Sequence, residues 1–134
     1  MPSPTLGLRL LLIAGASVLA APAVMAAPPP AGDPVRGGQL FLLCRACHTV
    51  APGQEHRMGP NLAGVFGTKA ASRPGYSYSP ALTKAKLVWN PASLDAYLKR
   101  PSQAVPGTKM PFGGVANASV RADLIAYLAT LKSK

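Results

Sequence analysis

The chain has 134 residues and carries 14 Lys and Arg against 4 Asp and Glu, a net charge of +10 that predicts attraction to acidic surfaces. The basic residues are scattered singly, without a Lys/Arg tract that alternates with aromatic residues, so a nucleic-acid-binding protein is excluded.

The N-terminus has the three-part pattern of a secretory signal peptide: a positive charge at Arg9, an apolar run over residues 10–21, and small residues around a cleavage point after Ala26. An uncleaved anchor is the alternative. We expect a signal peptide over residues 1–26, a flexible Pro-rich leader over 27–34 and one domain over 35–134. Cleavage would leave 108 residues with a net charge of +9, which is enough chain for one domain only.

The first helix of the domain is predicted to begin after Asp33, which can cap it, with Pro34 at the first helical position and an end near Cys47. Gly, Pro, Ser and Asn then break every periodic pattern between residues 49 and 81, which predicts a long loop.

A second helix is predicted with Asn90 as its cap and its end at Pro101, and residues 102–116 are again expected to form a loop. Asn117 caps the last and most regular helix, in which apolar residues such as Leu124 and Leu128 recur at steps of three and four. With about half of such a small domain in loops, an internal scaffold is needed, and a buried cofactor would provide it.

The sequence Cys44-Arg45-Ala46-Cys47-His48 contains both cysteines of the chain, and helical spacing brings the two thiols and the imidazole together. Thiols at this spacing can add to the two vinyl groups of haem, with His48 placed to bind the iron. A redox disulfide is a weaker alternative because no βαβ pattern surrounds the pair. A zinc site that adds His56 is weaker still, because adjacent Cys47 and His48 are poorly placed around one tetrahedral ion.

An electron-carrying haem needs a second axial ligand, and a methionine or a histidine can supply it. Met58 is only ten residues after His48, too close along the loop to reach the opposite haem face easily. Met110 lies in a Pro/Gly-rich loop far along the chain and is the expected ligand, while His56 and an open coordination site remain as alternatives.

The chain resembles the class I cytochromes c, of the mitochondrial type and its bacterial relatives, over nearly all of residues 27–134. The resemblance is carried by "GDPVRGGQLFLLCRACHTV", "HRMGPNLAGVFG", "PGYSYSPAL", Trp89, "LDAYLKRP", "VPGTKMPF" and "DLIAYL". It implies an all-α, small cytochrome c fold, with about three main helices and long loops wrapped around one haem c that is covalently bound through Cys44 and Cys47.

The resemblance also assigns roles to residues that spacing alone does not single out. Pro60 would offer its carbonyl to the free ring nitrogen of His48, with His48 and Met110 as iron ligands. Gly37 and Phe41 would meet Leu124 and Tyr127 where the first and last helices cross. The remaining cofactor-binding residues would be Tyr78, Ser79, Trp89 and Thr108 at the haem propionates and Tyr97 near Met110.

The chain also departs from the family pattern. Thr68 stands where many relatives have an Arg over a propionate, with Arg73 as a possible substitute, and Leu82 replaces a polar Asn near the haem. Positions that carry lysine around the haem edge in lysine-rich relatives are neutral here, namely Gly38, Leu43, Ser102, Ala116 and Asn117.

The expected function is that of a soluble, monomeric, single-haem electron carrier in the periplasm, and not of an enzyme. Its expected partners are acidic redox proteins: a quinol-cytochrome c oxidoreductase, a terminal oxidase or a periplasmic dehydrogenase. No nucleic acid and no small-molecule substrate are expected. A haem peroxidase or gas-binding cytochrome with an open iron site is the rival from a different class, and a fixed haem subunit of a larger dehydrogenase is a third possibility.

Overall fold

The computed structural model describes Met1 and residues 31–133, so the predicted signal peptide and most of the predicted leader lie outside the described residues. The elements in chain order are α1 (Pro34–Leu40), the 3₁₀ helix η1 (Phe41–Ala46), α2 (Pro80–Lys84), α3 (Pro91–Lys99), α4 (Pro101–Ala104) and α5 (Ala118–Thr130). No helix within the described residues is long and apolar enough to cross a membrane.

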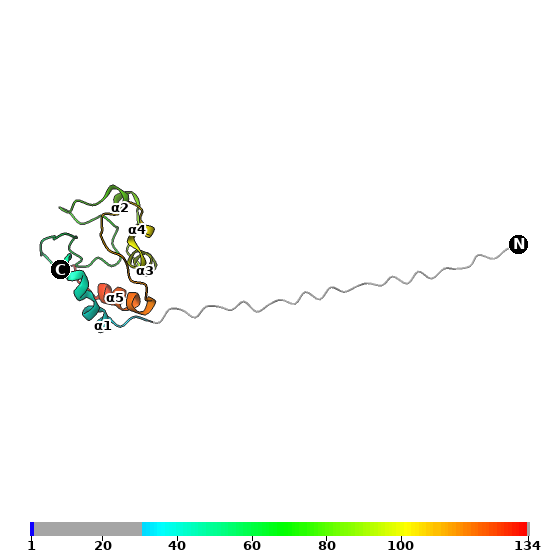
Figure 1. Ribbon diagram of the computed structural model, residues 1–134, viewed down its shortest axis with the longest axis horizontal. Coiled ribbons are helices and arrows are strands. Elements are labelled where there is room, and N and C mark those ends of the chain that lie inside the picture. Colours follow the sequence, from blue (N-terminus) through cyan, green and yellow to red (C-terminus); the bar gives the residue numbers. More distant parts are fainter. Residues whose placement is uncertain (2–30, 134) are drawn as a thin grey trace.

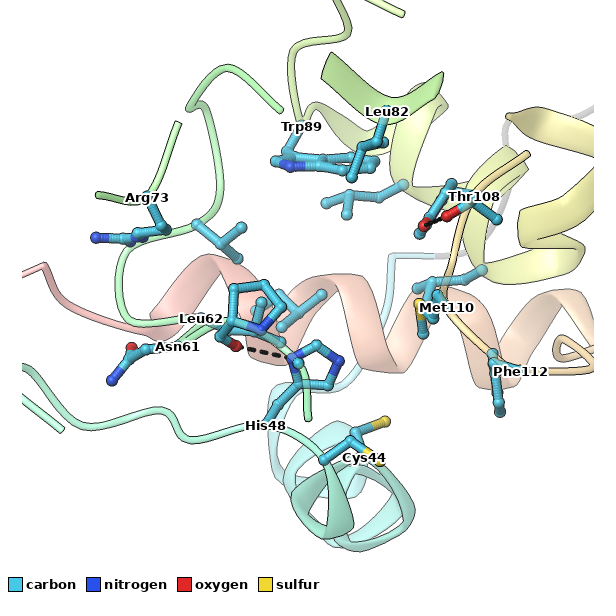
Figure 2. A pocket seen from close by; sticks show the side chains of 18 of the residues that line it. Cys44, His48, Asn61, Leu62, Arg73, Leu82, Trp89, Thr108, Met110 and Phe112 are labelled. Carbon is cyan, nitrogen blue, oxygen red and sulfur yellow. Dashed lines mark hydrogen bonds between the residues drawn. The ribbon is translucent and has the colours of Figure 1, made fainter. Parts of the chain in front are cut away.

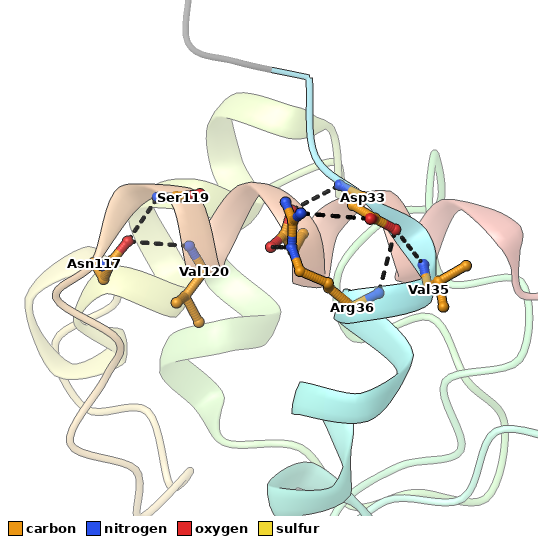
Figure 3. Close-up of polar contacts among 7 residues, drawn as sticks. Asp33, Val35, Arg36, Asn117, Ser119 and Val120 are labelled. Atoms are coloured by element: carbon orange, nitrogen blue, oxygen red, sulfur yellow. Dashed lines mark hydrogen bonds and ion pairs between the residues drawn. The ribbon is translucent and has the colours of Figure 1, made fainter.

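The three predicted helix starts are confirmed, because each has the expected polar cap followed by its helix. The Asp33 carboxylate accepts from the backbone N–H groups of Val35 and Arg36, and Asn117 caps α5 in the same way (Figure 3). Asn90 and Ser93 form a reciprocal capping box at α3.

Three details differ from the sequence-based prediction. The first helix is not continuous to Cys47, because the α-helix ends at Leu40 and the chain tightens into η1, where two neighbouring glycines leave α1 little intrinsic stability. The predicted loops also contain two short helices, α2 and α4. Pro80 and Pro101 occupy the first positions of these helices, where proline is tolerated because no N–H is needed there.

Helices α1 and α5 lie against each other at one end of the domain, α3 contacts both α5 and the short α4, and α2 lies at the other end (Figure 1). A Cβ added to Gly37 would lie 2.0 Å from the carbonyl oxygen of Asp123, so glycine is what allows the two backbones to touch. The Phe41 ring packs against the Tyr127 ring with 5.1 Å between centroids. The predicted crossing of the first and last helices is therefore confirmed.

An ion pair that was not predicted from the sequence stabilises the contact between α1 and α5. The Arg36 guanidinium donates to both carboxylate oxygens of Asp123 at 2.9 and 3.0 Å, and the backbone N–H of Asp33 donates to the same carboxylate at 2.7 Å (Figure 3). These contacts hold the pKa of Asp123 below its usual range.

The long segment between η1 and α3 folds back over the helices without forming a sheet in the described part of the chain. One isolated antiparallel bridge joins Lys69 to Val88, and the backbone N–H of Trp89 donates to the carbonyl of Thr68 at 2.9 Å. This pairing brings the buried Trp89 side chain to the interior, facing the cavity that the helices leave open.

Candidate functional site

A cavity of about 510 Å³ lies at the centre of the domain, in the size range of ligand and cofactor sites. Its walls come from η1, from the loops on either side of α2, from α3 and α5, and from the loop after α4. The cavity lining includes every site residue predicted from the sequence: Cys44, Cys47, His48, Pro60, Tyr78, Ser79, Trp89, Tyr97, Thr108 and Met110.

Both cysteines line the cavity, Cys44 from within η1 and Cys47 from the residue that caps the C-terminus of η1. The backbone N–H groups of Cys47 and His48 both donate to the Cys44 carbonyl, at 3.1 and 2.9 Å. Both thiols are free of a disulfide, and burial raises the pKa of Cys44. The turn therefore places both thiols on the cavity lining immediately before His48.

The His48 ring is held in one orientation by its neighbours (Figure 2). Its Nδ1 lies 2.8 Å from the Pro60 carbonyl oxygen, which can only accept, so Nδ1 carries the proton and the Nε2 lone pair is free. Gly59 provides the necessary space, since a Cβ there would lie 2.3 Å from Cε1 of the ring. Burial lowers the pKa of His48, and the Pro60 hydrogen bond opposes the shift. His48 is therefore a neutral imidazole prepared to bind a metal.

The candidates for a second ligand have different surroundings. Met110 is half-buried, lines the cavity and approaches it from a different wall from His48 (Figure 2). Met58 is 69% exposed, and its sulfur lies 3.7 Å from the Cys47 sulfur, at the cavity margin. His56 uses both ring nitrogens: Nδ1 accepts from the Asn61 N–H at 3.0 Å and Nε2 donates to the Pro74 carbonyl at 2.9 Å.

The predicted polar residues all lie on the cavity lining and contact one another or the backbone nearby. The Tyr97 hydroxyl and the Thr108 hydroxyl lie 2.7 Å apart, which links α3 to the loop that carries Met110. The Trp89 and Tyr97 rings pack at 5.0 Å between centroids. The Ser79 hydroxyl accepts from the Leu82 N–H as the cap of α2. Burial raises the pKa values of Tyr78 and Tyr97, so both hydroxyls stay protonated and can donate.

Sequence reasoning missed the residues that support the loop beside His48. Buried Asn61 donates to the carbonyls of Ala51 and Gln54 and accepts from the N–H of Ala63, which closes the loop below His48. The Tyr76 hydroxyl donates to the Met58 carbonyl. Asn61 is part of the "GPN" motif, but the sequence does not distinguish it from an asparagine in an ordinary turn.

These residues fit a haem. The lining is mainly apolar, as a buried porphyrin requires, and two thiols and an unprotonated imidazole nitrogen lie at one end. One buried donor, Nη2 of Arg73, has no hydrogen-bond partner among the described residues, as expected if the bound group carries acceptors. When bound, haem supplies one-electron chemistry through its iron. The two cysteines would attach it, and the protein would shield it from water.

Comparison with known proteins also indicates a haem protein. The chain is 51% identical over 100 residues to the cytochrome c2 of Rhodomicrobium vannielii, covering 75% of this chain and 80% of that protein. It is 47% identical over 104 residues to the cytochrome c2 of Rhodopila globiformis, covering 77% and 97%. No protein-family model matches the chain.

Among solved structures, cytochrome cH from Methylobacterium extorquens superposes with a TM-score of 0.70 at 42% identity, covering 74% of this chain and 99% of that one. The all-α architecture predicted from the sequence is thereby confirmed. With these identities over most of each partner, and with a Cys-x-x-Cys-His turn opening into an apolar cavity, the chain belongs to the class I cytochromes c, single-haem electron carriers with covalently bound haem c.

Proposed function

We propose that the protein is an exported electron carrier of the periplasm, with iron bound by His48 and Met110 and with no substrate at the iron. The observation that carries this proposal is the pairing of a His48 ring fixed by Pro60 with a half-buried Met110 on the wall of the same cavity. A thioether ligand favours ferrous iron, so the potential should be positive relative to a site with two histidines.

Methionine replacement tests the ligand assignment. Met110→Ala should abolish the charge-transfer band between sulfur and ferric iron and lower the reduction potential. Met58→Ala is the matched control because it removes the same thioether from an exposed position beside Cys47, and it should leave both properties nearly unchanged. If Met58→Ala abolishes the band and lowers the potential while Met110→Ala changes neither, the assignment is wrong.

Carbon monoxide separates a carrier from an enzyme. A haem peroxidase or gas-binding cytochrome needs a coordination position that is open or easily opened, whereas a carrier retains both ligands. The reduced spectrum of the wild-type protein at neutral pH should therefore be insensitive to carbon monoxide, and that of Met110→Ala should become sensitive. A rapid spectral change in the wild-type protein would favour the enzyme.

Export is proposed from the N-terminal pattern of charge, apolar run and small residues, with residues 1–26 as signal, 27–34 as leader and 35–134 as the haem domain. The intact mass of the periplasmic protein should equal residues 27–134 plus one haem. A full-length chain retained in the membrane fraction would instead indicate an anchor.

The partners are proposed to be acidic redox proteins that dock at the cavity mouth. Exposed Arg45, Arg57 and Lys109 lie near the cysteine turn and the Met110 loop in the sequence, and the side chain of Leu43 is 81% exposed beside half-buried Phe112 on the cavity lining. A cationic rim around an apolar centre matches the composition of transient docking surfaces. A quinol-cytochrome c oxidoreductase, a terminal oxidase or a periplasmic dehydrogenase would each present the complementary acidic face.

A further inference from the structure

Arg121, near the N-terminus of α5, is a buried cation that does not line the cofactor cavity. Its side chain is 6% exposed, and its Nε and Nη2 donate to the two carboxylate oxygens of Asp95 at 2.7 and 3.3 Å. Its Nη1 donates to the carbonyls of Val115 and Ala116 at 2.9 and 2.8 Å. One guanidinium therefore joins three segments of the chain: α3, α5 and the end of the loop that carries Met110.

The arrangement does more than pair two helices. An ion pair between α3 and α5 needs only the Asp95 carboxylate, whereas Nη1 is used entirely by the loop. The planar fork of arginine spreads its donors over three nitrogens, so one side chain can bind a carboxylate and two carbonyls. Hydrogen bonds from a charged donor are about twice as strong as neutral ones, so Arg121 is a strong attachment for this end of the loop.

The loop that carries Met110 has few hydrogen bonds of its own. Within the described chain, the backbone of residues 109–114 makes one hydrogen bond, from the Phe112 N–H to the Met110 carbonyl at 2.9 Å. The Lys109 ammonium donates to the Ser77 carbonyl, but both residues are exposed, so water can replace that bond. Segments with few buried contacts open at a low cost in free energy. The position of Met110 therefore depends on what holds the two ends of the loop.

Both ends of the loop are attached to α3. Figure 2 shows Thr108 and Met110 on the same stretch of chain, and the Thr108 hydroxyl lies 2.7 Å from the Tyr97 hydroxyl of α3. At the other end, the Val115 N–H donates to a backbone carbonyl of α3 at 2.8 Å, and Arg121 binds the Val115 carbonyl. The first attachment is a neutral hydroxyl pair. The second depends on a buried cation, which makes it the stronger candidate for control of the loop.

We propose that Arg121, held in place by Asp95, is a positioning residue that keeps the Met110 sulfur on the iron and thereby excludes small molecules from the iron. The inference rests on the proposed function in taking Met110 as the ligand. Without the guanidinium, the closed and open positions of the loop become closer in free energy, so the open position is populated more often. A small molecule that binds iron only when the loop is open then binds more tightly overall.

Imidazole is a suitable probe, because it binds ferric haem iron and must displace the methionine to do so. The purified ferric holoprotein is titrated with imidazole, and loss of the sulfur-to-iron charge-transfer band gives the dissociation constant. Arg121→Met removes the donors but keeps an unbranched side chain, and it leaves Asp95, whose side chain is 43% exposed, in contact with water. We expect Arg121→Met to bind imidazole about tenfold or more tightly than the wild type, as the loss of one charge-assisted hydrogen bond implies.

Arg36→Gln is the matched control. Arg36 also pairs with an aspartate across two helices, donating to Asp123 at 2.9 and 3.0 Å, but within the described residues none of its hydrogen bonds reaches the Met110 loop. Arg36→Gln should lower the free energy of unfolding while imidazole affinity stays close to that of the wild type. An equal gain in imidazole affinity in Arg36→Gln and Arg121→Met would trace the effect to a general loss of stability and would overturn the proposal.

Asp95→Asn is a milder variant that decides the matter if Arg121→Met does not mature. It preserves the shape of a partly exposed side chain but removes the charge that holds the guanidinium, and it should bind imidazole about threefold or more tightly than the wild type. Amide hydrogen exchange at Val115 should also be faster in this variant, and unchanged in Arg36→Gln, because the loop end is loosened locally. Wild-type imidazole affinity in Asp95→Asn, or in Arg121→Met, would overturn the proposal.

The wild-type ferric spectrum separates this proposal from the function on which it rests. If the wild type shows the sulfur-to-iron band, Met110→Ala lacks it, and the Arg121 and Asp95 variants bind imidazole as the wild type does, the carrier function stands and only the role of Arg121 fails. A wild-type holoprotein without the band would refute Met110 as the ligand and, with it, the positioning role.

Discussion

Replacement of Gly37 by alanine tests whether the contact between α1 and α5 holds the domain together. The added Cβ would lie 2.0 Å from the carbonyl oxygen of Asp123, 2.6 Å from its carbonyl carbon and 2.8 Å from Cβ of Tyr127. Two of these atoms belong to the backbone of α5, so no side-chain rotation relieves the overlap and the helices must separate. The neighbouring Gly38 is the control, because its Cβ would meet only the edge of the Tyr127 ring, at 3.3 Å.

The expected magnitudes follow from two opposing contributions. Alanine is favoured over glycine within a helix by about 1 kcal/mol, and this gain applies to both variants. Overpacking against backbone costs about 3 kcal/mol or more at Gly37, whereas the aromatic edge at Gly38 can shift by a few tenths of an ångström at little cost. Gly37→Ala should therefore destabilise the protein by about 2 kcal/mol or more, and Gly38→Ala should change its stability by less than about 1 kcal/mol.

Guanidinium chloride denaturation of the oxidised holoprotein, followed by far-UV circular dichroism, measures the difference. With a denaturant dependence of about 3 kcal/mol per molar, the midpoint of Gly37→Ala should fall by about 0.7 M or more, and that of Gly38→Ala should barely move. Equal midpoints for the two variants would show that α1 can shift away from α5 freely, and the argument from close backbone contact would fail.

Three further predictions concern the ion pair, the loop and the docking face. The pKa of Asp123 is depressed in the folded protein, so its stabilisation is present above the unfolded pKa of about 3.9 and is lost as pH falls through the folded pKa. Asp123→Asn should therefore lower the free energy of unfolding at neutral pH. In urea titrations at several pH values, the free energy of unfolding of this variant should decrease less at acidic pH than that of the wild type. Asn61→Ala leaves three backbone groups without their partner and should cost about 2–3 kcal/mol, seen as a lower melting temperature by calorimetry; a loss below about 0.5 kcal/mol would show that water replaces these bonds. Lys109→Glu should slow electron transfer to an acidic partner at low salt and have little effect on the rate at high salt. Lys84→Glu, on α2, should have a small effect on the rate at both salt concentrations. A larger effect of Lys84→Glu than of Lys109→Glu at low salt would place the docking face elsewhere. With several family lysine positions neutral, the salt dependence should be shallower than in lysine-rich relatives.

The sequence by itself determined the features that depend on local chemistry. The sequence predicted a helix start at each of three capping residues, Asp33, Asn90 and Asn117. A cap can be recognised in the sequence because its side chain accepts from backbone N–H groups only two or three residues further along the chain. The Cys44, Cys47 and His48 spacing likewise indicated a covalent haem, because attachment and ligation both occur within one turn. The order of motifs along the chain then identified the family before any distance was known.

Only the tertiary structure decided how distant segments share polar groups. The Arg36 to Asp123 pair, the bridge between Lys69 and Val88, and the engagement of both His56 ring nitrogens join residues that no periodicity relates. The sequence offered Arg73 only as a possible substitute for the arginine that Thr68 replaces, and the fold shows that its Nη2 is buried at the cavity without a hydrogen-bond partner among the described residues. Whether a polar atom is satisfied depends on everything packed around it, and that packing exists only once the chain has closed around its cofactor site.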